Sequence, residues 1–524
     1  MERLYDWIIR QGSVIDGKGS PRRQADIAIY KGRIAEIGEL GMVRGRQEWD
    51  ACGRVVCPGF IDAHAHDDLW LFRDPTCEPK LRQGVTTVIL GQDGLSHAPA
   101  SSHTQALVDA LWCGINGDRS TNATWTSVAE YISELDGHTA MNTAYLVPHL
   151  TVRMEVMGLA QRPATSAEVD VMCSIVSTAM TDGAVGLSSG LTYWPASHAT
   201  TDELVALCEA VSASGGLYAT HLRDYRDRVL EAIEEAICIG RRSGVPVHIS
   251  HLNHRAEVVS PPIDRARDAG MDVTFDLYPY LVGNTLLTQF IPAWVHGQSI
   301  DDTLQRLKEP GVREEMRLGL DTDSGTWDHY RLSSIRADES RHLEGKSLPE
   351  AARLTGRDLT DTICDLLISS RLAVSVLAFH THRDEEDVTA LMRHPAAMFC
   401  TDAILGGGYP HPRGYGTYPR ILGRYVRQNQ VLSLEEAVSK MTLLPARRFG
   451  FANRGILEQG MAADVVVLDA DSVIDEATYE QPRQWPGGIE AVWVNGVLAL
   501  GPDGPTGATP GRALTPLLQK DKSD

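Results

Sequence analysis

The sequence predicts an α/β protein: a (β/α)₈ TIM barrel with a small β-sandwich domain built from both chain ends and an insert over the barrel mouth. Three observations predict this fold. Between residues 58 and 450, short β-rich apolar runs alternate with helical stretches, which is the pattern of repeated βα units. Strand-like runs separated by turn signals occupy both chain ends. One connection inside the barrel region is much longer than ordinary loops.

The two chain ends carry similar strand-like runs. Turn signals such as Asp16-Gly17 and Lys31-Gly32 separate the runs of the first 57 residues. We expect residues 1–57 and 451–500 to form one composite β-sandwich, which would bring the termini together. The runs are Trp7–Arg10, Ile27–Tyr30, Ile34–Ile37, Ala463–Leu468 and Ala491–Gly496.

Residues 58–450 contain eight candidate barrel strands. Between the seventh and the eighth, residues from about 284 to 345 are rich in Trp, Arg, Asp and Glu, which predicts a lid or insert over the barrel mouth. From Gly501 onwards, residues 501–524 are expected to form a frayed or disordered tail. The eight strands are Phe60–Ala63, Val85–Leu90, Thr143–Val147, Ala184–Leu187, Leu217–Thr220, Val245–Ile249, Val273–Leu277 and Ala397–Cys400.

Composition limits the partners of the protein. The chain of 524 residues is 43% hydrophobic and 23% charged, as in ordinary globular proteins. Its net charge of −20 argues against nucleic-acid or anionic-membrane partners, because both need a basic face. We see neither a secretory signal nor an apolar stretch that could cross a bilayer. Nine scattered cysteines fit a reducing compartment, so we expect a cytoplasmic protein and leave a homo-oligomer open.

A pair of histidines ends the first barrel strand. The stretch Pro58–Asp67 combines buried apolar residues with His64 and His66. Strand geometry places these two side chains on the same side, so both imidazoles can bind one metal ion. The C-terminal end of a strand is also where a (β/α)₈ barrel has its active site. For such a short pattern, two hydrogen-bonded surface histidines in a turn are the alternative.

The later strands supply more ligand-type side chains. Nitrogen and oxygen ligands of this kind suit Zn²⁺, and their number suits one ion or two. Each residue alone has an ordinary explanation, since His221 could be a core histidine and Asp402 a helix cap. Their shared position at strand ends favours the metal site. The predicted ligands are His64, His66, Asp93, His221, His251 and Asp402.

Four other histidines are interpreted as structural. His248 lies three residues before His251 and should face the other side of the same strand. The remaining three lie near strand ends or in mouth loops and are His254, His380 and His382.

Over nearly its whole length the chain resembles the amidohydrolase superfamily, and within it the N-acyl-D-amino-acid deacylases, or D-aminoacylases. In that family, the two histidines of strand one and the aspartate of strand eight serve one metal position. The histidines of strands five and six serve the other. The matching motifs are Pro58–Asp68, Gly84–Val88, Gly91–Gly94, Gly183–Tyr193, Thr220–Asp224, Val245–His251, Tyr278–Tyr280, Thr401-Asp402 and His411–Arg420.

The chain departs from the family pattern at several positions. Asp93 stands where family members commonly have a metal-binding cysteine, and the fourth strand has no lysine that could be carboxylated and bridge two ions. Asp93 is therefore the best bridge candidate. Asn253 replaces a lysine, and Gly283-Asn284-Thr285 replaces Gly-Ser-Thr, both near the expected carboxylate pocket.

The resemblance implies metal-assisted hydrolysis of a small-molecule amide, an N-acyl-D-amino acid or a related compound. A Zn²⁺-bound water would be the nucleophile, with Asp402 as proton acceptor and donor. Either the other metal position or a hydrogen bond from Tyr193 would polarise the scissile carbonyl and stabilise the oxyanion. Arginines favour a carboxylate on the substrate, although surface salt bridges are the alternative for them. The expected substrate-binding residues are Arg223, Asn253, Tyr278, Tyr280, Asn284, His411 and Arg413.

Two other functions stay open at this point. A cyclic-amide hydrolase, such as a hydantoinase or a dihydroorotase, or an isoaspartyl dipeptidase would share the fold, although the missing strand-four lysine argues against their usual forms. A catalytically silent barrel that binds partners through its surface is the alternative outside enzymes.

Overall fold

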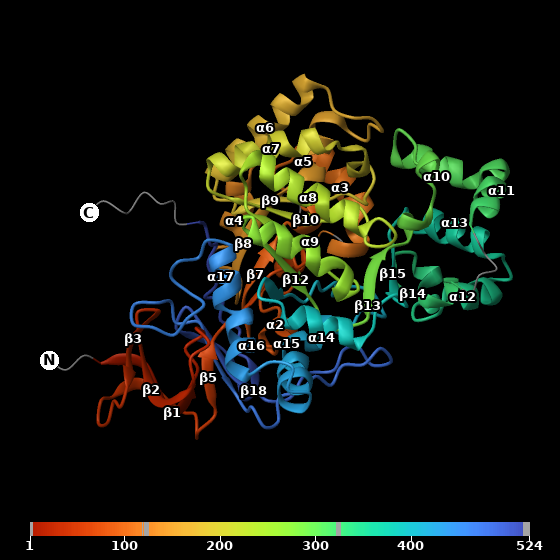
Figure 1. The fold of residues 1–524 in the computed structure, drawn as a ribbon. Coiled ribbons are helices and arrows are strands. Elements are labelled where there is room, and N and C mark those ends of the chain that lie inside the picture. The colour runs from red at the N-terminus through yellow and green to blue at the C-terminus, as the bar shows by residue number, and fades with distance from the viewer. Residues whose placement is uncertain (1–3, 118, 120–124, 321–325, 517–524) are drawn as a thin grey trace.

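Eight parallel strands form the barrel in the computed structural model, which describes residues 4–117, 119, 125–320 and 326–516 (Figure 1). Their order follows the chain from β6 to β12 and ends with β16. The sequence predicted every one of these strands to within three residues at either end. They are β6 (Phe60–Asp62), β7 (Val85–Leu90), β8 (Asn142–Pro148), β9 (Gly186–Gly190), β10 (Leu217–His221), β11 (Val247–Ile249), β12 (Val273–Leu277) and β16 (Ala397–Phe399).

The fourth barrel strand, β9, lies further along the chain than expected. The sequence predicted Ala184–Leu187 from its apolar run, whereas the strand is Gly186–Gly190. Ser188, Ser189 and Gly190 carry no apolar pattern, but each pairs with β10 in a regular parallel register. Pairing with neighbouring strands therefore decides the end of β9, and hydrophobicity does not.

The barrel closes where β6 meets β16. The backbone N–H of Asp402 donates to the carbonyl of His64 at 2.9 Å, and that of Ala63 donates to Phe399 at 3.4 Å. The Tyr418 hydroxyl lies 2.9 Å from the carbonyl oxygen of Ile61 and 3.2 Å from that of Phe399. This seam holds the ends of the first and last barrel strands together.

A buried ion cluster lies directly behind that seam. The Lys80 ammonium donates to Asp62 Oδ2 at 2.5 Å and to Thr401 Oγ1 at 2.7 Å, and its nitrogen is 3.0 Å from Asp67 Oδ2. All of these side chains are fully buried. Asp62 also accepts the backbone N–H of Thr401 at 2.8 Å, so the cluster ties the residues beside His64 to those beside Asp402.

Helices surround the barrel (Figure 1). Capping boxes fix where some of them begin. The side chains of Ser127 and Thr165 accept the backbone N–H groups of Glu130 and Glu168, and the carboxylates of these glutamates accept the backbone N–H groups of Ser127 and Thr165. The helices are α1 (Trp70–Arg73), α2 (Glu78–Leu81), α3 (Ser102–Asn116), α4 (Val128–Leu135), α5 (His149–Met157), α6 (Ser166–Thr181), α7 (Thr201–Ala213), α8 (Val229–Ser243), α9 (Ala256–Asp268), α14 (Glu385–Arg393), α15 (Arg413–Arg420), the π-helical turn Ile421–Gln428, α16 (Leu434–Met441) and α17 (Leu443–Arg448).

The two chain ends share one nine-stranded sheet. Its two halves join where β5 pairs antiparallel with β17, with Val56 opposite Val467. Trp7 and Trp49 pack edge-on against Trp493, each with ring centroids 5.4 Å apart. The strands are β1 (Tyr5–Val14), β2 (Arg23–Tyr30), β3 (Arg33–Gly38), β4 (Gly45–Asp50), β5 (Val55–Pro58), β17 (Val465–Leu468), β18 (Ile489–Val494), β19 (Val497–Gly501) and β20 (Gly504–Pro505).

A three-stranded sheet with its own helices lies between β12 and β16, at the side of the barrel in Figure 1. This insert extends beyond residue 345, its expected end. Its central strand, β15, begins only at Val374, so the insert continues well beyond that point. Its elements are β13 (Val282–Leu286), α10 (Ile300–Lys308), α11 (Pro310–Gly319), β14 (Tyr330–Ile335), α12 (Leu348–Thr355), α13 (Leu359–Ser369) and β15 (Val374–Phe379).

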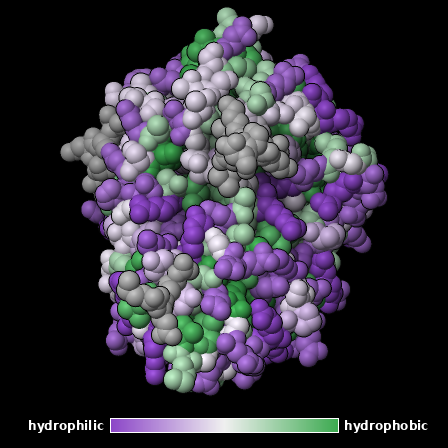
Figure 2. All heavy atoms as spheres, turned by 90° about the vertical axis from the view of Figure 1, so that its left-hand side faces the viewer, coloured by the Kyte–Doolittle hydropathy of each residue, from purple (hydrophilic) through white to green (hydrophobic). Residues whose placement is uncertain are grey.

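Part of the C-terminal tail is held against the barrel by backbone hydrogen bonds, contrary to the expectation of a frayed or disordered tail. The N–H of Gly511 donates to the carbonyl of Thr139 at 2.8 Å, and that of Leu514 donates to Thr143 at 2.7 Å. These bonds fix the chain at the entry to β8, and residues 517–524 lie outside the described residues. The face seen in Figure 2 mixes hydrophilic areas with smaller hydrophobic ones. Within the described ranges, no helix has both the length and the apolar character of a membrane span.

Candidate metal centre and substrate pocket

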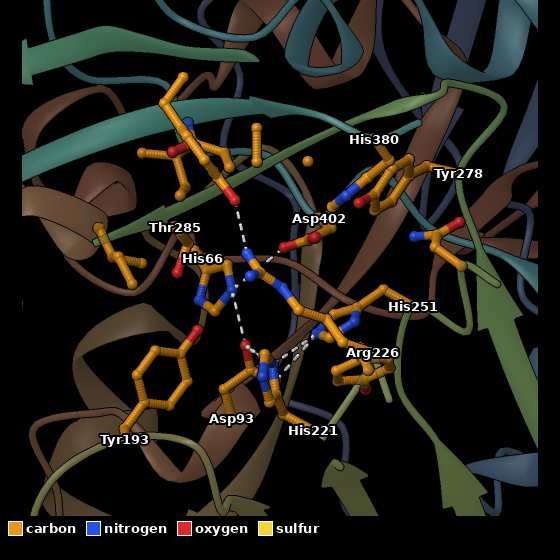
Figure 3. A pocket seen from close by; sticks show the side chains of 18 of the residues that line it. His66, Asp93, Tyr193, His221, Arg226, His251, Tyr278, Thr285, His380 and Asp402 are labelled. Carbon is orange, nitrogen blue, oxygen red and sulfur yellow. Dashed lines mark hydrogen bonds and ion pairs between the residues drawn. The ribbon is translucent and has the colours of Figure 1, made fainter. Parts of the chain in front are cut away.

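Six side chains from five barrel strands meet at the mouth of the barrel. All of them come from the C-terminal end of a strand or from the turn that follows it, as the sequence predicted. Figure 3 shows five of them around one cavity. The six are His64 and His66 after β6, Asp93 after β7, His221 at the end of β10, His251 after β11 and Asp402 after β16.

Asp93 lies in the middle of this group. Its Oδ1 is 3.5 Å from His64 Nε2 and 3.5 Å from His251 Nε2. Its Oδ2 is 3.6 Å from His66 Nε2 and 3.5 Å from His221 Nδ1. One carboxylate thus contacts the histidines of the first strand and those of the fifth and sixth, which is the arrangement of a bridging ligand.

The remaining distances complete two ligand clusters. His66 Nε2 is 3.3 Å from His64 Nε2 and 3.3 Å from Asp402 Oδ1, while His221 Nδ1 is 3.0 Å from His251 Nε2. Two ligands bound about 2.1 Å from a tetrahedral ion lie about 3.4 Å apart. Asp93 Oδ1 is buried and receives no hydrogen bond from any described residue. Donor types, spacing and this unpartnered oxygen all fit a metal ion.

The backbone at three of these positions is strained. Asp93, His251 and Asp402 have φ angles of 56°, 32° and 47°, in the left-handed region that non-glycine residues rarely adopt. At Asp93 the neighbouring chain leaves little freedom, because a Cβ at Gly190 would lie 2.2 Å from the carbonyl oxygen of Asp93. Such strain is typical of functional sites, where the surrounding structure holds a side chain in one direction.

Negative charge dominates the cluster. Burial disfavours the protonated form of His66, but hydrogen bonds and the charges of Asp402 and Asp93 outweigh burial and raise its pKa to about 10. Burial raises the pKa of Asp93, yet the charges of the surrounding histidines hold it well below its ordinary value. A cluster that attracts a proton so strongly also attracts a cation.

Arg413 contacts Asp402 on the side that faces away from the histidines. Its Nη1 is 2.8 Å from Asp402 Oδ2, and its guanidinium lies 4.5 Å from the ring centroid of Tyr278. Burial raises the pKa of Asp402, but the charge of Arg413 and the nearby histidines lower it below its ordinary value. Asp402 therefore stays ionised, with Oδ1 towards the histidines and Oδ2 towards Arg413.

A matching family model covers most of the chain. The model describes the amidohydrolase family and matches residues 47–499, a span that contains the whole ligand cluster. The chain belongs to the amidohydrolase family. This amidohydrolase is 37% identical over 526 residues to the N-acyl-D-glutamate deacylase of Alcaligenes xylosoxydans xylosoxydans, covering 98% of this chain and 97% of the relative. It is 36% identical to a D-aminoacylase of the same organism, covering 97% of each chain.

A solved structure supports the same relationship. The N-acyl-D-glutamate deacylase from Bordetella bronchiseptica, crystallised with zinc and a phosphonate inhibitor that mimics the tetrahedral intermediate, is similar to this amidohydrolase with a TM-score of 0.82. The two are 35% identical, and the comparison covers 98% of this chain and 100% of that one.

Four of the predicted side chains of this amidohydrolase line the cavity over the cluster, beside the predicted metal ligands. Tyr193 is 3% exposed, and burial raises the pKa of its hydroxyl well above the ordinary value, so the hydroxyl keeps its proton. Asn284 has no hydrogen-bond partner on either amide atom among the described residues. The four side chains are Tyr193, Asn253, Tyr278 and Asn284.

The structure does not bring Arg223 to this cavity. Its Nε is 2.8 Å from Glu235 Oε2 and its Nη2 is 2.9 Å from Glu235 Oε1, while the carbonyls of Ser197 and Ala199 accept at 3.0 Å each. The Arg223 guanidinium is therefore already occupied, as in the salt-bridge alternative. The sequence does not reveal this pair, because Glu235 lies 12 residues further along the chain, on α8, and only the fold brings it next to Arg223.

His411, Arg413 and Tyr280 also lie outside the lining of the cavity. His411 Nε2 is 3.0 Å from the carbonyl oxygen of Val282, and its Nδ1 accepts the N–H of Arg413 at 2.9 Å. Tyr280 packs against the guanidinium of Arg420, 4.7 Å from the ring centroid. These side chains therefore lie behind the residues that line the cavity. Arg413 reaches the site only through its ion pair with Asp402.

Sequence reasoning missed four residues of the site. His380 and His382 line the cavity, contrary to the expectation that both are structural. Arg383 is 5% exposed and donates to Asn253 Oδ1 and to the carbonyl of Tyr280, each at 2.7 Å. Arg226 lines the mouth. The segment His380–Arg383 directly follows β15 and contains two histidines and an arginine. The sequence predicts no strand before this segment, so its residues could not be assigned to a strand end.

Proposed function

We propose that this amidohydrolase hydrolyses the amide bond of N-acyl-D-amino acids. The observation that supports this most strongly is Asp93, whose carboxylate contacts histidines from β6, β10 and β11 at one barrel mouth. A chain 37% identical over its full length to an N-acyl-D-glutamate deacylase carries this cluster. The two facts together favour the deacylase over a silent binding protein, which has no need of such a cluster.

The residues present fit one or two Zn²⁺ ions. His64, His66 and Asp402 would hold one ion, His221 and His251 the other, and Asp93 would bridge them. When bound, zinc makes a water molecule acidic near neutral pH and polarises the scissile carbonyl. Asp93 is a harder ligand than cysteine, which favours metals that prefer oxygen ligands.

Asp402 would carry the proton of the reaction. Its Oδ1 faces His64 and His66, at 3.8 and 3.3 Å from their Nε2 atoms, while Arg413 holds Oδ2. The ionised carboxylate takes a proton from the attacking water at Oδ1 and gives it to the departing nitrogen. The Tyr193 hydroxyl keeps its proton, because burial raises its pKa, and so it can donate to the oxyanion.

Asn253 and Arg383 together would receive the substrate carboxylate. Arg383 binds Asn253 Oδ1, which leaves Asn253 Nδ2 as a buried donor without a partner among the described residues. Arg383 itself forms no ion pair with a described carboxylate. An amide donor with a positive charge behind it thus takes the place of the lysine found in many deacylases. Asn284 and Tyr278 complete this side of the cavity.

The cellular context is also part of this proposal. The net charge of −20 supports a small-molecule substrate rather than a nucleic acid or an anionic membrane. Scattered cysteines support a cytoplasmic location. Assembly into a homo-oligomer is compatible with the chain.

A substrate panel tests the proposed reaction. Zinc-loaded enzyme is expected to release amino acid from N-acetyl-D-amino acids, with kcat/KM at least about 10⁴ M⁻¹s⁻¹ for the best compound. The same enzyme should leave hydantoins, dihydroorotate and β-aspartyl dipeptides at least a hundredfold slower. Faster cleavage of a cyclic amide or of a β-aspartyl peptide would contradict the proposal, and so would metal-loaded protein that hydrolyses none of them.

A further inference from the structure

Arg226 is an arginine at the cavity mouth without an acidic partner. It follows β10, lines the cavity and points into it in Figure 3. Its Nη2 donates to the Tyr330 hydroxyl at 2.6 Å, a neutral acceptor from β14 of the insert. Its guanidinium forms no ion pair with a carboxylate of the part of the chain that the structure describes. Most of its five donors are thus available to a ligand.

The other arginines of the same loop are paired. Arg223 donates to both carboxylate oxygens of Glu235, and Arg228 forms an ion pair with Glu231. Of these three arginines, only Arg226 reaches the cavity, and its partner is the Tyr330 hydroxyl instead of a carboxylate. Tyr330 is 7% exposed and anchored in the insert sheet, so its hydroxyl holds the guanidinium over the mouth and leaves its charge unbalanced.

The wall beside Arg226 is positive as well. Burial lowers the pKa of His380 well below its ordinary value, and the charges of Arg383, His382, Arg226 and Arg413 lower it further. Apart from the candidate metal ligands Asp93 and Asp402, no described carboxylate lines this cavity. Positive charge without a counter-ion in a half-closed cavity is typical of a site whose counter-ion is the ligand.

Two arginines therefore act on this cavity, one through Asn253 and one directly. Arg383 acts through Asn253, which follows β11, and Arg226 lies in the loop after the neighbouring strand β10. A carboxylate bound at Asn253 would leave the Arg226 guanidinium with only the Tyr330 hydroxyl as partner. We propose that Arg226 binds a second carboxylate of the substrate, so that the preferred substrates are N-acyl-D-amino acids with two negative charges. This inference rests on the proposed deacylase function and adds a specificity-determining residue to it.

The second carboxylate has two chemical sources. It can belong to the amino-acid side chain, as in N-acetyl-D-glutamate and N-acetyl-D-aspartate, or to the acyl group, as in N-succinyl-D-methionine. N-acetyl-D-methionine carries a single carboxylate and is the reference. We expect kcat/KM of the zinc-loaded enzyme to be at least about tenfold higher for one of the two dianionic classes, because a charge-assisted pair contributes about that much.

Arg226→Met tests the residue itself. The ratio of kcat/KM between the preferred dianion and N-acetyl-D-methionine is expected to fall about tenfold to a hundredfold, mainly through KM. Arg226→Lys should retain part of the ratio, and Tyr330→Phe should lower it by a smaller factor. The matched control is Arg228→Met, from the same loop but ion-paired to Glu231 outside the cavity, and it should leave the ratio unchanged.

Raising the salt concentration gives an independent readout. It should raise KM for the dianion more in wild-type enzyme than in Arg226→Met, because screening weakens the pair that only the wild type has. Equal kcat/KM for all four compounds, or a ratio that Arg226→Met leaves intact, would overturn this inference while the deacylase function stands. Failure to hydrolyse any of the four would overturn both.

Discussion

Asp402→Asn is expected to lower kcat about 10²–10⁴-fold while zinc remains bound, because an amide cannot take the proton of the attacking water. The substituted side chain keeps its size and one oxygen next to His66, so the ligand cluster loses little of its geometry. Steady-state kinetics and zinc content of the same preparation measure the two properties together. If Asp402→Asn lost zinc and activity to the same extent, Asp402 would be a metal ligand without a role in proton transfer.

The matched control for this variant is Asp264→Asn. Asp264 is a half-exposed carboxylate on α9 that lies 2.9 Å from His394, far from the proposed chemistry. It is expected to keep kcat within about twofold, since exposed ion pairs contribute little. An Asp402→Asn enzyme that works at a rate similar to this control would remove Asp402 from the proton-transfer role.

Lys80→Met is expected to have the largest effect on stability. It leaves Asp62 and Asp67 buried together without a cation, which costs about 3–5 kcal/mol of the free energy of unfolding. Burial already raises the pKa of Asp67 even with Lys80 present. Urea unfolding at fixed zinc concentration, followed by circular dichroism, measures the loss as a lower midpoint.

Two further variants identify the cause. Lys346→Met removes an exposed lysine that is 3.0 Å from Glu350, and it should change the free energy of unfolding by less than about 1 kcal/mol. Adding Asp67→Asn to Lys80→Met removes one buried charge and should restore part of the midpoint. A Lys80→Met midpoint equal to that of wild type would show that the buried cluster does not stabilise the barrel seam.

The sequence predicted the barrel strands and the ligand cluster because both depend on local pattern. An apolar run such as Val85–Leu90 is buried on both sides and therefore forms the same strand in the structure. The end of a parallel barrel strand is also a defined place, so His221 and Asp402 could be assigned to the mouth from their positions alone.

The parts that sequence missed depend on contacts between distant segments. Arg223 and Arg226 are three residues apart, yet Glu235 on α8 holds the first and Tyr330 of the insert holds the second. The composition of residues 284–345 does not reveal the end of the insert, because β15 comes later in the chain and pairs between β13 and β14. The positive φ angles of Asp93, His251 and Asp402 are equally invisible in sequence, because none of them is glycine.

The zinc centre is the central claim, and anomalous diffraction at the zinc absorption edge tests it most directly. Crystals of the zinc-loaded protein should show one or two peaks about 2.0–2.2 Å from the nitrogen and carboxylate atoms of the cluster around Asp93. With two peaks, Asp93 should contact both. A map without a peak between His64, His66 and Asp402, from protein that still hydrolyses its substrate at full rate, would contradict the account.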